Sequence, residues 1–291
     1  MFYLIVVTIL WAFSFSFIGV YLSDQIDSYF AVFIRVLFAS LVFLPFTRFR
    51  KIPNLLKLQI MTIGAIQIGI MYLFYYNSFL YLSVPEVLLF TIFTPFYVTL
   101  IYDIFQKRFS FLYLISAAIA VFGAYVIRYE NINEDFLFGF LLIQGANICF
   151  ALGQSGYKYI LEKHKNINQK EVFGYFHFGA LIIGVIALIS FGDFNKMQPD
   201  FIQWKVLIWL GFVASGAGYF MWNKGATMVD VGVLGIMNNA LIPAGLIVNI
   251  IFWGKDENYT TLFIGSMIIV FSLFLHRHFL KISNKKYKTI S

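Results

Sequence analysis

The sequence predicts an all-α membrane protein in which ten transmembrane helices form two inverted five-helix repeats around a central cavity. Composition is the first observation behind this prediction, because 60% of the 291 residues are hydrophobic and only 12% are charged. A soluble domain carries about 25% charged residues. Charge this sparse cannot cover a surface in water, so lipid must surround most of the chain. The other two observations are the length of the apolar segments and a pattern that recurs in both halves.

Apolar segments long enough to cross a bilayer fill the chain. A crossing helix needs ~20 mostly apolar residues, and ten segments come close to that length. They are residues 2–20, 29–46, 58–77, 82–102, 111–127, 136–157, 172–191, 204–222, 231–252 and 261–276. A transmembrane β-barrel would alternate in polarity over ~10-residue segments, so these continuous runs favour helices.

The distribution of basic residues orients these segments. Lysine and arginine concentrate in the cytoplasmic connections of membrane proteins. With the N-terminus in the cytoplasm, most of the 21 lysine and arginine residues fall on that side, and acidic residues lean to the other side. Because ten is even, both termini are then cytoplasmic. A bacterial inner membrane is the expected location.

A proline pattern recurs in the fourth and ninth segments. Pro95 and Pro243 lie 148 residues apart (243 − 95), and each follows a small residue, Ser78 or Ala226, by the same 17 positions (95 − 78 and 243 − 226). Since each half has five segments, the second half would cross the membrane in the opposite direction. Inverted repeats of this kind are typical of secondary transporters. Proline bends a helix, so both prolines are predicted hinges, with static kinks as the alternative.

The repeats define the predicted domains. The first repeat covers residues 1–133 and the second covers 134–280. Residues 281–291 form a basic cytoplasmic tail, which we interpret as facing anionic lipid rather than nucleic acid.

Arg35 is the only strong charge in the run 29–46. An isolated arginine in the bilayer costs at least ~2.5 kcal/mol, so it needs a partner. One interpretation is an ion pair with Glu86, which lies at a similar depth in the fourth segment. A second is that the planar guanidinium binds a substrate carboxylate, and a third is that the side chain snorkels to the headgroups. Glu86 is the predicted gate or coupling residue.

Amide and tyrosine side chains inside the segments supply further candidates. Asn238 and Asn239 precede Pro243 near the middle of the ninth segment, where they could line a cavity or hold helices together. The other candidates for substrate contacts are Gln67, Tyr72 and Tyr102. We interpret Ser14, Ser16, Asn147 and Gln154 as packing residues, with a ligand contact as the alternative. His177 is interpreted as a hydrogen-bonded histidine, with a proton relay as the alternative.

Motifs for chemistry are missing from the sequence. It has no phosphate-binding glycine loop, no nucleophile elbow and no His–Glu metal motif. Its single cysteine, Cys149, cannot form an internal disulfide. We therefore expect no catalytic residue, no metal and no cofactor. An ion or water channel would need charge rings or a carbonyl filter, which are not evident.

Four stretches carry a resemblance to a known family. "ILWAFSFSFIGVYL", "FIRVLFASLVFLPF", "SVPEVLLFTIFTPF" and "MVDVGVLGIMNNALIPAGLIVNIIFWGKD" together resemble the drug/metabolite transporter superfamily, in particular its EamA-like branch. The resemblance implies a carrier of small metabolites that does not hydrolyse ATP. The chain departs from the family pattern at Arg108, where a Gly-Glu pair is common, and at Ile242, where glutamate is common. These departures weaken any transfer of substrate identity.

The resulting functional prediction is a secondary transporter for amino acids or related carboxylates and amines, working by alternating access. Its partners are then a small solute and the lipid bilayer. Small residues in 64–69 and 211–220 favour close helix approach and would allow a homodimer. The alternatives are a channel and a membrane receptor or scaffold that transports nothing.

Overall fold

The computed structural model describes residues 1–50, 52–105, 134–229 and 231–254, with scattered positions in 115–126 and 260–279. All regular secondary structure in these residues is helical. Among the described residues, seven helical segments are long and apolar enough to cross a membrane, and Met237–Trp253 is a shorter apolar helix. The chain is therefore an integral membrane protein.

Eight of the predicted segments coincide with observed helices to within a few residues. In the first half, the first crossing is α1 (Phe2–Tyr21), and the second is α2 (Ser28–Phe43) followed by η1 (Leu44–Phe46). The third crossing consists of α3 (Asn54–Gly64), η2 (Ala65–Ile70) and α4 (Met71–Ser78). The fourth crossing consists of α5 (Val84–Phe90), η3 (Thr91–Phe93) and α6 (Thr94–Phe105). In the second half, α8 (Glu134–Lys163), α9 (Gln169–Phe191) and α12 (Val231–Trp253) each match one predicted segment. A further segment consists of α10 (Phe201–Ile208), η6 (Trp209–Ala217) and α11 (Gly218–Thr227). The short helix η5 (Phe194–Lys196) lies between α9 and α10.

The fifth and tenth predicted segments lie largely outside the described residues. These are residues 111–127 and 261–276, and the tail 281–291 lies outside as well. The count of ten crossings therefore stays a prediction.

Polar side chains cap the helices at their ends. The Asp27 carboxylate accepts a hydrogen bond from the backbone N–H of Phe30 at the start of α2. Ser83 and Glu86 form a capping box at the start of α5, as Asp200 and Gln203 do at the start of α10. These side chains bind N–H groups that have no partner inside the helix. The caps thus fix where each of these helices begins.

Two of the crossings that the structure describes contain a π-helical turn. Ala65–Ile70 joins α3 to α4, and Trp209–Ala217 joins α10 to α11. π-Helical turns are often found at functional sites. The carbonyl of Ala214, inside the second turn, accepts a hydrogen bond of 2.8 Å from the indole Nε1 of Trp11 on α1. This bond ties α1 to the π-helical turn.

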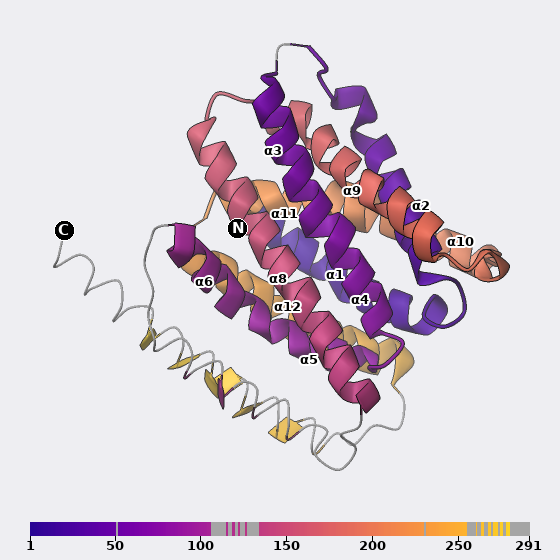
Figure 1. Ribbon diagram of the computed structural model, residues 1–291. Coiled ribbons are helices and arrows are strands. Elements are labelled where there is room, and N and C mark those ends of the chain that lie inside the picture. The colour runs from indigo at the N-terminus through magenta and orange to yellow at the C-terminus, as the bar shows by residue number, and fades with distance from the viewer. Residues whose placement is uncertain are drawn as a thin grey trace.

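The helices pack side by side as a bundle (Figure 1). In Figure 1, α8 crosses the bundle with α3 and α4 on one side and α6 on the other. Helix α2 packs on α9, η6 and α4, whereas α1 packs on α12 and α11. Close packing of α3 on α9 depends on Gly64 and Gly179, because a Cβ at either position would overlap a backbone carbonyl, that of Phe176 or Met61 respectively.

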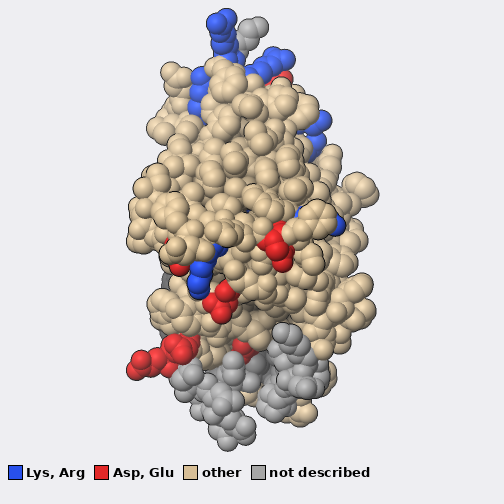
Figure 2. Space-filling model, turned by 90° about the vertical axis from the view of Figure 1, so that its right-hand side faces the viewer, with Lys and Arg blue, Asp and Glu red and all other residues tan. Residues whose placement is uncertain are grey.

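Charged side chains are unevenly distributed over the surface. Figure 2 shows most of the visible lysine and arginine residues at one end of this face, with a largely uncharged belt next to them. Most of the visible acidic residues, together with a few further lysine or arginine residues, lie on the other side of that belt. Arg48 and Glu171 form an ion pair of 3.2 Å, and Lys196 and Asp24 form another of 3.8 Å. The uncharged belt has the composition expected of a surface in contact with lipid.

Candidate substrate cavity

A cavity lies inside the bundle, lined by helices from both halves of the chain. It encloses about 630 Å³ of space not filled by protein atoms, its opening included. The lining residues are Trp11, Ser14, Phe15, Arg35, Met71, Tyr72, Tyr75, Thr91, Thr94, Ile143, Ala146, Asn147, Phe150, Tyr219, Asn238 and Leu241.

Arg35 is the charged residue in this lining. Its side chain is 2% exposed. Nε donates a hydrogen bond of 2.6 Å to Ser215 Oγ, and Nη1 donates one of 3.2 Å to the Tyr76 hydroxyl. The guanidinium carbon lies 4.3 Å from the centre of the Tyr72 ring, a distance at which a cation is attracted to the ring face. Nη2 has no acceptor among the residues that the structure describes.

The helix packing places these partners around the guanidinium. Ser215 belongs to the π-helical turn η6, and its hydroxyl also lies 2.7 Å from the Tyr72 hydroxyl. Gly211 in the same turn lies close to Phe38 and to the Arg35 backbone, because a Cβ there would come within 3.1 Å of the Arg35 carbonyl oxygen. The small residues of η6 thus bring Ser215 within reach of Arg35.

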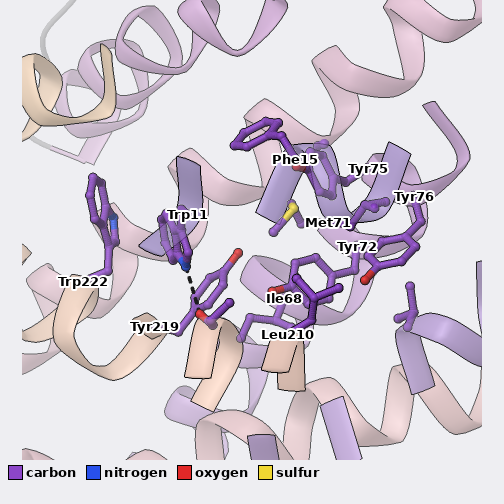
Figure 3. Close-up of a cluster of buried hydrophobic side chains, with 14 of the residues drawn as sticks. Trp11, Phe15, Ile68, Met71, Tyr72, Tyr75, Tyr76, Leu210, Tyr219 and Trp222 are labelled. Carbon is purple, nitrogen blue, oxygen red and sulfur yellow. Dashed lines mark hydrogen bonds between the residues drawn. The ribbon is translucent and has the colours of Figure 1, made fainter. Parts of the chain in front are cut away.

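Aromatic rings form much of the remaining wall. Figure 3 shows Trp11, Tyr72, Tyr75 and Tyr219 directed toward a common region, with the hydrogen bond from Trp11 drawn as a dashed line. The ring centres of Trp11 and Tyr219 lie 4.8 Å apart, and those of Tyr72 and Tyr219 lie 6.0 Å apart. Such a wall suits a ligand with an apolar body and a few polar groups.

A set of amides forms a second polar part of the lining. Asn147 on α8 accepts a hydrogen bond of 3.1 Å from Thr94 Oγ1, and its Nδ2 donates one of 2.8 Å to the carbonyl of Phe90. Asn238 on α12 donates to the carbonyl of Leu234 at 2.9 Å and to Gln154 Oε1 at 3.4 Å.

Three of the predicted substrate-binding residues line the cavity. These are Arg35, Tyr72 and Asn238. Gln67 is fully buried against Gly153 of α8 and is not part of the lining, and Asn239 is not part of it either. Tyr102 belongs to α6, but its side chain lies outside the described part of the structure.

Glu86 does not form the ion pair with Arg35 that one interpretation required. Among the described residues no ion pair joins the two, and Glu86 Oε2 accepts a hydrogen bond of 2.8 Å from the backbone N–H of Ser83. The capping box explains why this carboxylate sits at the start of α5. Its role as a gate or coupling residue stays a prediction.

The two predicted hinge prolines differ in their surroundings. Pro95 is buried in the first turn of α6, directly after the 3₁₀ turn η3. Pro243 lies inside α12 and is exposed on the surface of the described structure. The 3₁₀ turn that interrupts the fourth crossing therefore includes Thr91 and ends beside Thr94, both of which line the cavity.

Sequence reasoning missed several lining residues. Trp11, Ser215 and Tyr219 were not among the candidates, and Ser14 and Asn147 were assigned to packing, yet these residues line the cavity or hold Arg35. The available signal was their position: each lies in the interior of an apolar segment, where a polar group needs a partner.

Comparison with known proteins identifies the family. The model of the EamA-like transporter family matches residues 1–129. The biotin transporter of Escherichia coli (strain K12) is 50% identical over 277 residues, which cover 94% of this chain and 92% of that protein. The chain belongs to the EamA-like transporter family. It is a small-molecule transporter and not an enzyme.

Other relatives of this EamA-like transporter are also bacterial. The biotin transporter of Salmonella typhimurium (strain LT2) is 48% identical over 276 residues, covering 94% of this chain and 92% of that protein. A probable biotin transporter of Pseudomonas aeruginosa is 48% identical over 276 residues, covering 94% and 96%. A solved structure described as "Crystal structure of protein" superposes with a TM-score of 0.67 at 14% identity, covering 94% of this chain and 95% of that one, which supports the fold alone.

These relatives correct one expectation. The family resemblance led to amino acids as the predicted substrates, but the relatives at this identity are named for biotin. Amino-acid transport is therefore not supported.

Proposed function

We propose that this protein is a secondary carrier of biotin, or of a closely related carboxylate, and that Arg35 binds the carboxylate of the solute. Biotin has one carboxylate on a short alkyl chain and a bicyclic head that contains a cyclic urea. A cavity with one guanidinium and mostly apolar and aromatic walls suits such a molecule.

The environment of Arg35 is the observation that carries the proposal. Its guanidinium is buried, lines the cavity and has no carboxylate partner among the described residues. Hydrogen bonds from Nε to Ser215 and from Nη1 to Tyr76, together with the face of the Tyr72 ring, hold the planar guanidinium in place. Nη2 stays available, and a carboxylate oxygen is the acceptor that suits it best. A bound anion would supply the counter-charge that no described carboxylate provides to Arg35.

The arrangement of helices supports the two inverted repeats that we propose, residues 1–133 and 134–280. Each crossing of one repeat corresponds to the crossing at the same position in the other repeat, and corresponding crossings make corresponding packing contacts. Helix α1 packs on α12 as α8 packs on α6, α1 packs on α11 as α8 packs on α4, and α2 packs on η6 as α9 packs on α3. The two π-helical turns also correspond, since position 213, which lies in η6, follows Ala65 by the same 148 residues that separate the prolines (213 − 65).

Alternating access follows from this symmetry. Two related halves around one cavity can open it to either side in turn. The 3₁₀ turn η3 and Pro95 interrupt the fourth crossing where it lines the cavity, so this crossing is the proposed moving element in the first half. Pro243 would play the corresponding part in α12.

The charge distribution supports an inner-membrane protein with both termini in the cytoplasm. The lysine- and arginine-rich end in Figure 2 would face the cytoplasm. All the relatives described above are bacterial.

Solute exchange in proteoliposomes tests the function. Vesicles loaded with biotin, amino acids and polyamines would be diluted into buffer with labelled solutes, and each would be followed separately. We expect saturable counterflow of biotin alone. Counterflow of amino acids without biotin would contradict the proposal, and an unsaturable flux would favour a channel.

A further inference from the structure

The cavity contains a second set of polar groups that Arg35 does not touch. Ser14, Asn147 and Asn238 all line the cavity, with exposures of 4%, 3% and 8%. They come from α1, α8 and α12, whereas the partners of Arg35 come from α4 and η6. Among the described residues no hydrogen bond links the two sets. The cavity therefore has two separate polar regions.

Asn238 presents an open acceptor to the cavity. Its Nδ2 donates to the carbonyl of Leu234 and to Gln154 Oε1, which uses both hydrogens of the amide. Because the Leu234 carbonyl can only accept, the orientation of the amide group is fixed. Oδ1 of Asn238 has no donor among the described residues, so it is free to accept a hydrogen bond from a ligand.

Asn147 and Ser14 complete the set. Asn147 Nδ2 donates to the carbonyl of Phe90 and to Gln144 Oε1, and Oδ1 accepts from Thr94. One lone pair of that oxygen remains. Ser14 Oγ is buried and has no hydrogen-bond partner in the described structure. A buried hydroxyl without a partner is unfavourable unless something else binds it.

We infer that Ser14, Asn147 and Asn238 form a subsite for the planar polar head of the solute, a cyclic urea or a group with the same hydrogen-bond pattern. A urea has two N–H donors on either side of one carbonyl. The donors match the free oxygens of Asn147 and Asn238, and the carbonyl matches the Ser14 hydroxyl. This inference rests on the proposed function and adds to it the group that is recognised at the second polar region.

The subsite would determine specificity among carboxylates. A carboxylate without a urea would still reach Arg35 but would leave these buried oxygens and the hydroxyl unpaired. Unpaired buried polar groups discriminate strongly against a ligand that lacks the matching group. Phe15, Met71 and Phe150 add apolar lining to the same cavity, against which an alkyl chain would pack.

Competition against labelled-biotin counterflow tests the inference. Lipoate supplies a carboxylate and a ring without a urea, and biotinamide supplies the urea without a carboxylate. In Ser14→Ala and in Asn238→Leu, we expect the apparent affinity for biotin to fall about tenfold, while the affinity for lipoate stays unchanged. The preference for biotin over lipoate should therefore shrink by the same factor.

Two neighbouring residues supply matched controls. Ser16 lies on α1 but binds Asn249 instead of lining the cavity, and Asn239 adjoins Asn238 but is not part of the lining. Ser16→Ala and Asn239→Leu should keep the wild-type preference for biotin over lipoate. Thermal unfolding in detergent would show which variants are folded, and Ser14→Ala, which removes one oxygen atom, keeps the test readable if Asn238→Leu does not fold.

The outcomes separate the subsite from the proposed function. If the wild type does not exchange biotin, the proposed function fails and the subsite fails with it. If the wild type exchanges biotin but Ser14→Ala and folded Asn238→Leu keep its full preference over lipoate, the subsite alone is wrong. A similar loss of preference in the control variants would also overturn it.

Discussion

Arg35 illustrates how a single side chain can be placed by physical argument. A lone guanidinium inside an apolar run must be buried with partners or reach the headgroups, and the structure buries it beside a cavity. The nature of the partners was not predictable. Ser215 lies 180 residues away in the chain, and Glu86, the acidic residue at the expected depth, is used in a helix cap instead.

Ser215 is predicted to orient Arg35. It accepts from Nε and lies beside the Tyr72 hydroxyl, so Ser215→Ala frees the guanidinium to turn. We expect KM for biotin to rise about five- to tenfold with little change in the maximal rate. Transport assays in proteoliposomes would measure both. Ser40→Ala is the control, because Ser40 binds backbone carbonyls, and an equal effect in that variant would contradict an orienting role.

The difference between Asn238 and Asn239 shows where residue-level prediction stops. Neighbouring residues on a helix point about 100° apart, so only one of the pair faces the cavity. Helix α12 is apolar along most of its length, and its sequence gives little indication of which face turns inward. Packing against α1 and the fourth crossing decides this, and those contacts are not visible in a single segment.

At the scale of the helices, the apolar segments predicted the positions of most crossings but not their internal breaks. A π-helical turn inserts one residue into a helix and rotates everything after it. The sequences of Ala65–Ile70 and Trp209–Ala217 carry no signal for such a turn beyond small residues. The residues that follow, including Tyr72 and Tyr219, consequently point in directions that regular helical spacing does not predict.

The hydrogen bond from Trp11 to Ala214 is predicted to stabilise the second π-helical turn. Trp11→Phe keeps one aromatic ring but removes the indole N–H and part of the ring system, so the Ala214 carbonyl loses this donor. We expect a loss of about 1–2 kcal/mol in the free energy of unfolding, visible as a lower Tm in detergent. Trp204→Phe, at a surface position, is the matched control. Equal Tm values for the two variants would show that the bond contributes nothing.

The contact between α3 and α9 is predicted to tolerate no side chain at Gly179. A Cβ there would overlap the carbonyl of Met61, whereas a Cβ at Gly184 on the same helix would make ordinary contact with Phe33. Gly179→Ala should destabilise the protein by about 1–3 kcal/mol, and Gly184→Ala should be close to neutral. Thermal unfolding of the two purified variants makes the comparison. A Tm for Gly179→Ala equal to that of Gly184→Ala would contradict the described packing.

For the whole molecule, the proline and charge patterns led to two predictions that local propensity could not supply, a duplication and an orientation in the membrane. The 148-residue spacing between Pro95 and Pro243 pointed to a duplication, and the packing of the helices supports it. Substrate identity was not accessible in the same way. The predicted preference for amino acids came from a broad family resemblance, and relatives named for biotin overturned it.

Topology is testable with single cysteines. In a Cys149→Ala background, Lys196→Cys and Lys165→Cys place thiols in exposed connections that we assign to the outside and the cytoplasm. A membrane-impermeant maleimide applied to intact cells should label the first and not the second. Labelling of Lys165→Cys alone would mean that the orientation is opposite to the proposed one. Labelling of both would mean that the two connections do not lie on opposite sides of the membrane.

The central claim is that Arg35 binds the carboxylate of the solute, and equilibrium binding of labelled biotin to the purified protein tests it most directly. We expect saturable binding to the wild type, much weaker competition from biotinamide than from unlabelled biotin, and at least a ~10-fold weaker affinity in Arg35→Ala. The Tm of each sample, measured in parallel, confirms that the variant is folded. If folded Arg35→Ala binds biotin as tightly as the wild type does, the assignment of Arg35 is wrong.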